Sequence, residues 1–363
     1  MSLLVRIPKP SYLFRQLSPR EKPDGGLYQT LMEIANFFQL GPIENCYRAP
    51  KSNSLNVIVE TGSGKYVFRA HSLSEETVAH EYQVLQYLEA RNFPAPQMVS
   101  GPGGEAWFRV GENLCSVYKF VEGYSAANFI WWPAARNDLI TQAGRALAAY
   151  HTAVKGLRPA PFKWDGYRPT EHRRWREGEM YRNALREIHP LIEKSTATRA
   201  VDQFARTHIA DVERMLQLEE VVEGCSDLSK LVIHGDYAPW NVLYRAGQAP
   251  FILDFNSARL DLQIFDIILA TLFFAWRGNR LDMKRAIAFQ AGYAELGRLS
   301  GVDTEMASAV FQWVMGRSMA ERLRSHYLEE RFIIESTTGL ERFYTMCMFA
   351  EQHPKQIVAG LTG

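Results

Sequence analysis

The chain has 363 residues, of which 47% are hydrophobic, and eight tryptophans, so we expect two folded domains or one large two-lobed domain. Its 41 Lys and Arg nearly balance its 40 Asp and Glu, which argues against binding to nucleic acid or to a membrane surface, because such proteins need excess positive charge. The four cysteines lie far apart without a CxxC pair, which favours free buried thiols in a reducing compartment over disulfides or a metal site.

Residues 1–25 are rich in Pro, Arg and Lys, and we expect an N-terminal extension with little core of its own. Their apolar run of three residues is too short for the core of a signal peptide. The most apolar later stretch, 264–276, contains Asp266 and is shorter than a membrane-spanning helix. We therefore expect a soluble cytoplasmic protein.

The next region combines helical and strand patterns. Apolar residues at steps of three and four predict helices over 27–38 and 74–93. Alternation on both sides of a Gly-Ser-Gly turn predicts a hairpin over 53–70. Further short strands are expected at 94–100, 105–110 and 115–123. We expect residues 26–121 to form a small N-terminal lobe, whose antiparallel sheet carries one helix.

The remainder is mainly helical. A helix is predicted over 136–154, further helices reach about residue 220, and helical patterns return over 263–360. Between them, short apolar runs at 230–236, 241–244 and 251–255 indicate strands. We expect residues 122–363 to form a larger C-terminal lobe that contains a polar strand–loop–strand segment.

Three polar residues lie in this segment. Asp236 and Asn241 are five residues apart, and Asp254 follows Asn241 by 13 residues on a separate apolar run. A loop between two strands can place Asp236 at its crest, and a hairpin can bring Asp254 beside Asn241. A carboxylate and a carboxamide suit Mg²⁺, which prefers oxygen ligands, while Asp236 can accept a proton from an attacking hydroxyl. The spacing therefore predicts phosphoryl transfer.

Each of these residues taken alone has a simpler interpretation as a turn former or a helix cap. Only their joint occurrence on apolar strand segments favours a site. His234, next to the loop, is expected to hydrogen-bond to the backbone and to support the crest of the loop; an acid–base role for it is the less favoured alternative.

The pattern HGDYAPWNVL followed by ILDF resembles the catalytic and metal-binding loops of the aminoglycoside phosphotransferase / choline kinase-like family, which includes homoserine kinase-like enzymes. Weaker features extend the resemblance over about residues 40–345: the strand GKYVFRA, Glu81 in the next helix, SVYKFVEG, His151 in GRALAAYH and Asp266 in LQIFDIILA. The resemblance implies an α+β, two-lobed protein-kinase-like fold, with a small antiparallel-sheet lobe and a larger, mainly helical lobe.

The resemblance also implies ATP- and Mg²⁺-dependent phosphorylation of a small-molecule hydroxyl. Asp236 would be the catalytic base, and Asn241 and Asp254 would hold Mg²⁺. Arg69 would contact the α- and β-phosphates and pair with Glu81. The adenine pocket would be lined by Val117, Tyr118, Lys119, Phe120 and Val121, and Asp266 would anchor the helix behind the active site.

The chain departs from the family pattern in two places. Arg69 stands where Lys is commonest, and it offers a planar fork instead of a compact ammonium group. Lys65, four residues earlier on the same face of the strand, is the alternative phosphate-binding cation. No glycine-rich loop is present; Ser52 and Asn53 occupy the corresponding stretch and offer hydroxyl and backbone donors.

In the sequence, only the charge balance of residues 155–199 indicates which molecule accepts the phosphate. Residues 155–199 contain 11 Lys and Arg against six Asp and Glu. A polycationic aminoglycoside favours an acidic pocket, so this balance mildly favours a hydroxy amino acid, an amino alcohol, a sugar or an anionic metabolite. The alternative is that these charges form a solvated helix face. In the later helix, Arg317, Arg324 and Tyr327 either face the site or pair with Glu321 and Glu329.

Two other classes compete with a small-molecule kinase. A non-catalytic nucleotide-binding pseudokinase is suggested by Arg69 and the missing glycines, but Asp236, Asn241 and Asp254 are all present. A protein kinase is disfavoured because only a short link joins Asp254 to Asp266, leaving little platform for a peptide. The sequence does not indicate the oligomeric state.

Overall fold

The structure, a computed structural model, describes residues 25–48, 56–71, 75–111, 113–128, 137–157, 178–194, 199–278, 280–329 and 336–361. The chain divides into two compact units. The sheet unit comprises Met1–Trp131, Gly156–Pro169 and Trp240–Ala258, and the helical unit comprises Trp132–Lys155, Thr170–Pro239 and Arg259–Gly363. The lobe boundaries predicted above, 26–121 and 122–363, stay predictions, and the predicted N-terminal extension lies almost wholly outside the described residues.

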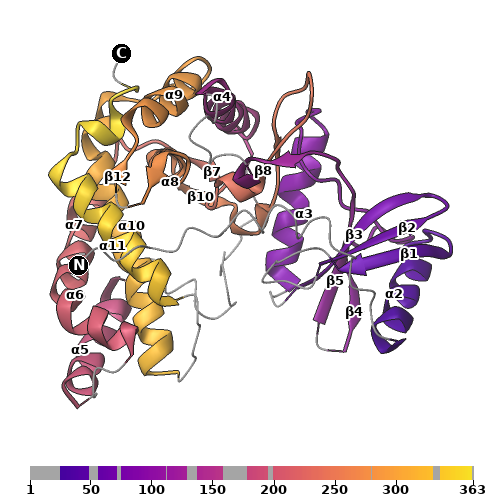
Figure 1. The fold of residues 1–363 in the computed structure, drawn as a ribbon, viewed down its shortest axis with the longest axis horizontal. Coiled ribbons are helices and arrows are strands. Elements are labelled where there is room, and N and C mark those ends of the chain that lie inside the picture. The colour runs from indigo at the N-terminus through magenta and orange to yellow at the C-terminus, as the bar shows by residue number, and fades with distance from the viewer. Residues whose placement is uncertain are drawn as a thin grey trace. The chain divides into compact units, whose positions relative to one another are not determined.

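The sheet unit contains a five-stranded antiparallel sheet (Figure 1). The strands, in the spatial order β1-β2-β3-β5-β4, are β1 (Ile43–Arg48), β2 (Asn56–Thr61), β3 (Gly64–His71), β5 (Asn113–Lys119) and β4 (Phe108–Val110). β2 and β3 form the hairpin expected from the alternating pattern, and Gly64 has φ +147°, a conformation that favours glycine.

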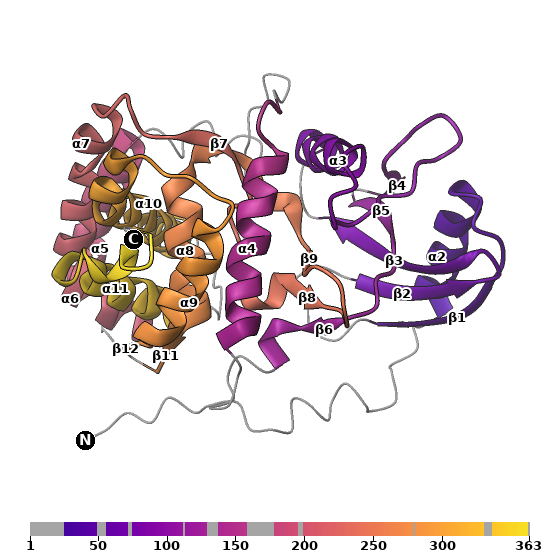
Figure 2. The ribbon, with the colours of Figure 1, turned by 90° about the horizontal axis from the view of Figure 1, so that it is seen from above.

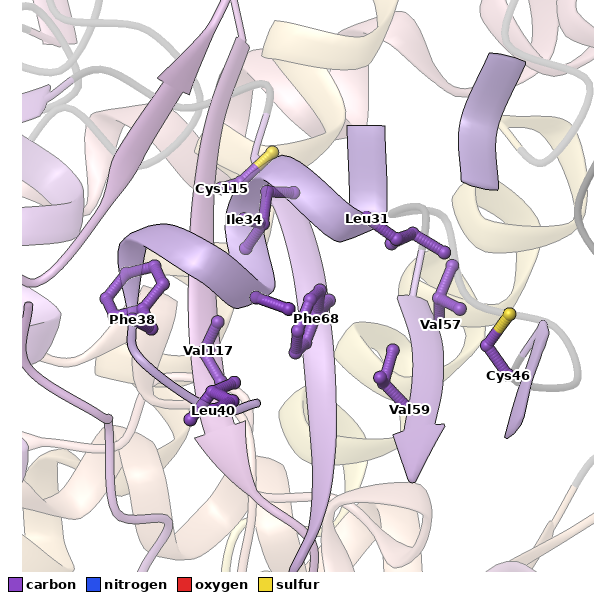
Figure 3. Close-up of a cluster of buried hydrophobic side chains, with 11 residues drawn as sticks. Leu31, Ile34, Phe38, Leu40, Cys46, Val57, Val59, Phe68, Cys115 and Val117 are labelled. Atoms are coloured by element: carbon purple, nitrogen blue, oxygen red, sulfur yellow. The ribbon is translucent and has the colours of Figure 1, made fainter. Parts of the chain in front are cut away.

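One face of this sheet is covered by helix α2 (Gly25–Phe37). Alternate residues of the strands, among them Val57, Phe68 and Val117, pack with Leu31 and Ile34 of α2 in one apolar cluster (Figure 3). Because side chains alternate between faces along a strand, Arg69 points away from this cluster. The helix predicted over 27–38 therefore closes the core of the sheet unit.

Helix α3 (Glu75–Glu89) lies on the other side of the sheet from α2 (Figure 1). Its buried side includes Val84 and Leu88, but also two titratable residues, His80 and Glu81. His80 Nε2 donates to the carbonyl oxygen of Ala258 at 2.9 Å. The helix is thus tied to the segment that follows Asp254.

A second, three-stranded sheet of the same unit carries part of the predicted site. Its strands are β6 (Tyr124–Ser125), β8 (Val242–Tyr244) and β9 (Phe251–Ile252), in the order β6-β8-β9. The short 3-10 helix η1 (Ala126–Asn128) follows β6, and η3 (Phe255–Ser257) follows β9. β8 and β9 form a short hairpin, so residues immediately outside its paired positions are close in space.

The strand predicted over 94–100 is wrong as a regular strand. Only an isolated bridge forms there, between Met98 and Tyr118. Pro94 and Pro96 have no backbone N–H, so this segment cannot sustain a full ladder. The region instead contributes single hydrogen bonds, such as Ile252 N–H to the carbonyl oxygen of Pro94 at 3.1 Å.

The helical unit is built from eight α-helices in the described part of the chain. They are α4 (Asn137–Ala153), α5 (Gly178–Lys194), α6 (Ala200–Gln217), α7 (Glu219–Glu223), α8 (Gln263–Ala275), α9 (Met283–Ala294), α10 (Gly301–Tyr327) and α11 (Ser336–Gln352). Every residue of α8 is buried, which explains why it is the most apolar stretch of the chain. In the described ranges, no helix is long and apolar enough to cross a membrane.

Short irregular pieces complete this unit. Antiparallel strands β7 (Lys230–Ile233) and β10 (Arg259–Leu262) bracket the predicted catalytic segment, in part as expected from the apolar runs. β11 (Trp276–Arg277) and β12 (Arg280–Leu281) form a hairpin inside the region expected to be helical throughout. The remaining 3-10 helices are η2 (Pro239–Asn241) and η4 (Gln356–Val358).

Helix α4 runs alongside α9 in both views (Figures 1 and 2). Their backbones approach closely at two glycines. A Cβ atom at Gly144 of α4 would lie 1.9 Å from the carbonyl oxygen of Phe289, and one at Gly292 of α9 would lie 2.0 Å from that of Thr141. Only glycine fits at either position, and this contact fixes the helix that carries His151.

Candidate active site

The β8–β9 hairpin places Asn241 and Asp254 next to each other. Val242 pairs with Ile252, and one step further along, Leu253 N–H donates to the carbonyl oxygen of Asn241 at 2.8 Å. Asp254 then turns with φ +63° and ψ +72°, a left-handed conformation that Asp adopts more readily than most residues. Asn241 is largely buried, with 5% of its surface exposed.

The side chains of this pair offer one carboxylate and one carboxamide oxygen donor. Hard oxygen donors from one or two side chains fit Mg²⁺, which takes its remaining ligands from phosphates and water. Within the described ranges, no cluster of three or more His, Cys, Asp or Glu side chains forms a metal site. The Asn241–Asp254 pair offers oxygen donors that suit Mg²⁺, and its role as a metal site stays a prediction.

Arg69 of β3 lies beside Asp254. Its Nη1 donates to Asp254 Oδ1 at 3.0 Å, with 12% of the Arg69 side chain and 33% of the Asp254 side chain exposed. Burial lowers the pKa of the guanidinium, but the neighbouring charges of Asp254 and Glu81 outweigh it and leave this pKa above its ordinary value. Arg69 is thus a fixed positive charge at the predicted metal ligand.

The expected ion pair between Arg69 and Glu81 is not formed; among the described residues Arg69 pairs with Asp254 instead. Glu81 is 2% exposed, and burial raises its pKa to about 7, against the lowering effect of Arg69. Desolvation therefore disfavours the charged form of Glu81. The carboxyl group of Asp254 is a third exposed and does not carry the same cost of burial.

Lys65, the alternative cation, is engaged elsewhere. Its Nζ lies 3.1 Å from Glu60 Oε1 and 4.4 Å from the centre of the Phe120 ring. Lys65 and Arg69 share a face of β3 by strand period, but only Arg69 contacts Asp254. The assignment of the phosphate-binding cation stays a prediction, and the geometry favours Arg69.

The predicted adenine-binding residues lie on β5 and just after it. Val117 faces the apolar cluster under α2, and the buried side chain of Tyr118 lies next to that of Glu81. Lys119 N–H donates to the carbonyl oxygen of Gln97 and Phe120 N–H to that of Lys65, both at 2.9 Å. Their role, with that of Val121, stays a prediction. Ser52 and Asn53 lie outside the described residues.

In the helical unit, the loop after β7 is held by Asp266 of α8. The buried carboxylate of Asp266 accepts hydrogen bonds from the backbone N–H of His234 at 2.8 Å and of Gly235 at 3.0 Å. Gly235 has φ +79°, which favours glycine at the turn. The backbone N–H of Asp236 donates to His234 Nδ1 at 3.2 Å, so three successive residues of the loop have defined backbone positions.

Asp266 is itself the end of a buried hydrogen-bond chain. Gln263 Nε2 donates to the hydroxyl of Tyr293 at 2.6 Å, Tyr293 lies 2.8 Å from His151 Nδ1, and His151 Nε2 lies 3.1 Å from Asp266 Oδ2. Since a carboxylate only accepts, Nε2 of His151 carries the hydrogen and Nδ1 accepts from the Tyr293 hydroxyl. Burial opposes ionisation of Asp266, yet these hydrogen bonds and the nearby histidines lower its pKa.

Some of these supporting residues were missed. No local pattern links Tyr293 to His151, which are 142 residues apart. His80 had a usable signal, because it lies on the buried side of the amphipathic helix α3, where an unpaired polar residue is rare. The sequence marks His151 only as part of the family resemblance and does not indicate its contact with Asp266.

The predicted substrate-side residues of α10 are occupied by other contacts. Arg324 pairs with Glu321 at 2.9 Å and with Glu329 at 3.0 Å, which is the alternative left open above. Arg317, 2% exposed, instead pairs with Glu219 at 3.0 Å. The basic segment 158–177 lies outside the described residues, so its charge balance remains a sequence observation.

Comparisons with known proteins identify the family and the fold of the chain. The sequence profile of the phosphotransferase enzyme family matches residues 48–300. A homoserine kinase from Phenylobacterium zucineum is 24% identical over 250 residues, which cover 68% of this chain and 68% of that protein. Among solved structures, a spectinomycin phosphotransferase in complex with ADP and spectinomycin is 15% identical with a TM-score of 0.61, covering 89% of this chain and 98% of that one. A microcompartment-associated aminopropanol kinase is 17% identical with a TM-score of 0.58, covering 91% and 98%.

These similarities confirm the fold class expected from the sequence. The chain has the α+β, protein-kinase-like fold, with a small antiparallel sheet and a mainly helical part. At identities of 15% and 17%, the solved structures establish the fold alone. The structural similarity therefore does not identify the phosphate acceptor.

Proposed function

Because the chain belongs to the phosphotransferase enzyme family and is a small-molecule kinase, we propose that it transfers the γ-phosphoryl group of ATP to the hydroxyl of a small hydroxy amino acid, with Mg²⁺ as the metal. The proposal is carried by the positions of three side chains on two segments, the β8–β9 hairpin and the loop after β7. Asn241 and Asp254 share one hairpin, and Asp236 follows a loop backbone that Asp266 holds in place.

The chain's own residues have separate tasks in this reaction. When bound, Mg²⁺ neutralises charge on the ATP phosphates, and Asn241 and Asp254 would hold it there. Asp236 orients the acceptor hydroxyl and takes its proton as the acceptor oxygen forms a bond to the γ-phosphorus. The bond from that phosphorus to the β-phosphate oxygen breaks, which leaves ADP and a phosphate ester.

The rigidity of the loop supports this role for Asp236. The reacting groups must be held to within a fraction of an ångström, because a small displacement costs a large factor in rate. The backbone N–H groups of His234 and Gly235 donate to Asp266, and that of Asp236 donates to His234 Nδ1; these three hydrogen bonds fix the backbone that carries the Asp236 carboxylate. His234 and Asp266 act as positioning residues in this proposal, in line with the supporting role predicted for them.

The relatives favour an acceptor that bears a carboxylate, because those of 24–26% identity are homoserine kinases. Arg342 of α11 is partly buried, and burial lowers its pKa. Its guanidinium lies 5.2 Å from the centre of the Phe273 ring, and its Nε has no hydrogen-bond partner among the described residues. The similarity to the homoserine kinase from Phenylobacterium zucineum makes homoserine the first acceptor to test.

The test is an ADP-release assay with ATP and Mg²⁺ across homoserine, serine, aminopropanol, choline, a hexose and spectinomycin. We expect turnover with homoserine above the other acceptors and a loss of at least 10³-fold in Asp236→Asn, since the base is removed while the side-chain shape is kept. Phosphohomoserine is identified directly by mass spectrometry.

Two outcomes would contradict the proposal in different ways. Turnover confined to an aminoglycoside or a sugar would overturn the acceptor class but keep the kinase. Turnover of Asp236→Asn equal to the wild type would overturn the assignment of the base. The pseudokinase alternative predicts no ADP with any acceptor, and nothing in the family match supports it.

A further inference from the structure

Helices α4, α8 and α9 of the helical unit pack together (Figure 2). They supply the buried hydrogen-bond chain that ends at Asp266: His151 comes from α4, Tyr293 from α9, and Gln263 from α8 like Asp266 itself. None of these four side chains is more than 6% exposed. Because water has almost no access to them, the chain itself decides where its hydrogen atoms lie.

The direction of the first hydrogen bond is set by a backbone carbonyl group. Gln263 Nε2 lies 2.6 Å from the hydroxyl of Tyr293 and 3.3 Å from the carbonyl oxygen of Arg298. A carbonyl oxygen only accepts, so the side-chain amide of Gln263 points its NH₂ group, not its oxygen, toward both partners. The hydroxyl oxygen of Tyr293 therefore accepts from Gln263 and directs its own hydrogen elsewhere.

The hydroxyl of Tyr293 then donates to His151. Nδ1 of His151 lies 2.8 Å from this hydroxyl. Burial raises the pKa of Tyr293, so the hydroxyl keeps its hydrogen at neutral pH. A Cβ atom at Gly297 would collide with the Tyr293 ring, so the backbone of Gly297 packs directly against the ring and restricts it. Since Nδ1 accepts, Nε2 carries the single ring hydrogen of a neutral imidazole.

We propose that Gln263 and Tyr293 are positioning residues for the loop after β7. They hold His151 in its neutral form, which leaves the negative charge of Asp266 available to the backbone of the loop that carries Asp236. The inference rests on the proposed function only for the role of Asp236 as the base. It goes beyond that function because it concerns the hydrogen positions in a buried chain, which are set before ATP or the acceptor binds.

Competition at one oxygen atom explains why the state of His151 matters. Oδ2 of Asp266 accepts from the backbone N–H of His234 at 2.8 Å and also lies 3.1 Å from His151 Nε2. A charged donor binds a carboxylate about twice as strongly as a neutral donor does. A second proton on His151 would therefore pull Oδ2 toward the imidazolium and weaken the bond that holds the loop.

Two opposing effects act on the second proton. Burial raises the pKa of Asp266, but the hydrogen bonds and charges of the neighbouring histidines bring it below its ordinary value, so the carboxylate stays ionised. Its negative charge attracts a second proton to His151, and the hydrogen bond from Tyr293 to Nδ1 opposes it. Further titratable groups around the chain are His234 of the loop, Tyr150 of α4 and Asp303 of α10.

NMR of the whole protein with ¹⁵N-labelled histidine tests the inference without any substrate. A neutral imidazole gives two widely separated ring-nitrogen shifts, whereas an imidazolium gives two similar ones. The signals of His151 are those that disappear in His151→Gln. In the wild type we expect the neutral form, with hydrogen on Nε2, from about pH 8 to about pH 6. In Tyr293→Phe, which keeps the ring but removes the hydroxyl, we expect the imidazolium to appear as the pH falls.

Steady-state kinetics show whether the hydrogen positions affect the loop. We expect kcat of Tyr293→Phe to fall by about threefold at pH 8 and by about 10-fold or more at pH 6, with KM for ATP within about twofold of the wild type. A loss that grows in acid is not expected from a packing defect alone. Gln263→Leu removes the donor that directs the Tyr293 hydroxyl, and it should change kcat in the same direction by a smaller factor.

Tyr344→Phe is the matched control. Tyr344 of α11 is another tyrosine of the helical unit whose hydroxyl donates to a carboxylate oxygen, Asp211 Oδ2, at 2.8 Å. The substitution removes a similar hydrogen bond from outside the chain that ends at Asp266. It should change neither the His151 signals nor the pH dependence of kcat.

The outcomes distinguish this inference from the proposed function. A wild-type His151 that is doubly protonated, or that carries its hydrogen on Nδ1, would overturn the inference and leave the kinase intact. A loss of kcat in Tyr293→Phe that is the same at every pH would do so as well. If this variant does not fold, the wild-type spectrum and Gln263→Leu decide the question. Absence of turnover with every acceptor would overturn the proposed function, while the NMR spectra would still decide the state of His151.

Discussion

At the scale of single residues, Asp266 connects distant parts of the helical unit. Its two carboxylate oxygens accept from the backbone of His234 and Gly235, and one of them also meets His151. Asp266, His151 and His234 are buried and Gly235 is partly buried, so each hydrogen bond that is lost leaves a donor with poor access to water. A carboxylate is the side chain that can accept all three bonds.

We expect Asp266→Asn to lower kcat by about 10²-fold or more and to cost about 2–4 kcal/mol of unfolding free energy, because its amide nitrogen would face a backbone N–H. Steady-state kinetics with homoserine and denaturant unfolding measure the two effects. Asp282→Ala is the control: Asp282 caps α9 through Arg285 N–H, so its loss should cost about 1 kcal/mol without changing kcat. Equal kinetic effects in both variants would contradict the positioning role.

At the scale of elements, helix packing places His151. Gly144 and Gly292 allow α4 and α9 to touch through their backbones, and α4 carries His151 near its C-terminal end. A helix interior normally disfavours glycine by about 1 kcal/mol relative to alanine. These two glycines therefore cost local helix stability, which the close packing of the helices offsets.

We expect Gly144→Ala to destabilise the protein by about 3 kcal/mol, because its Cβ would lie 1.9 Å from a backbone oxygen that cannot move aside without shifting α9. Gly301→Ala, at the start of α10, is the matched control with no atom within 4 Å of the new Cβ. It should be neutral or slightly stabilising in the same denaturant titration. Similar losses in both variants would show that helix propensity, not the contact, decides the effect.

At the scale of the whole molecule, buried histidines make stability depend on pH. Burial lowers the pKa of His71 to about 3 and that of His80 to about 4, against an ordinary value of 6.5. The unfolded chain therefore binds two protons near pH 6.5 that the folded chain refuses, and stability is lost as the pH falls below that value. Glu81 acts in the opposite direction, because its raised pKa lets the folded chain bind a proton between about pH 7 and 4.5.

As the pH falls, the two histidines lower the free energy of unfolding and Glu81 raises it. Between pH 6.5 and 5 the three groups together change the free energy of unfolding by about 1.4 kcal/mol per pH unit, with the protein less stable in acid. His71 has no hydrogen-bond partner in the described residues, so His71→Leu removes one titrating group without orphaning another. We expect this variant to lose most of that slope when chemical unfolding is compared at pH 6.5 and pH 5. An unchanged slope would contradict the burial argument.

Local sequence patterns predicted most of the helices and strands, and they also predicted that Asn241 and Asp254 lie close together. The helices α3 and α4, the β2–β3 hairpin and the run of helices after residue 263 follow from periodicity, because each is decided by neighbouring residues. Asn241 and Asp254 are adjacent for the same reason, since a short hairpin joins them. The segment 94–100 does not form a regular strand, because its two prolines have no backbone N–H to donate to a neighbouring strand.

The sequence by itself determined the kind of chemistry: a carboxylate, a carboxamide and a second carboxylate at a spacing that suits a metal-dependent phosphoryl transfer, within one family. Only the tertiary structure decided how the long-range partners are distributed. Arg69 meets Asp254 across 185 residues, and His151 meets Asp266 across 115. The physical reason is burial. Arg69 pairs with Asp254 and not with Glu81 because the two carboxylates differ in the cost of desolvation, and that cost exists only once the chain has folded.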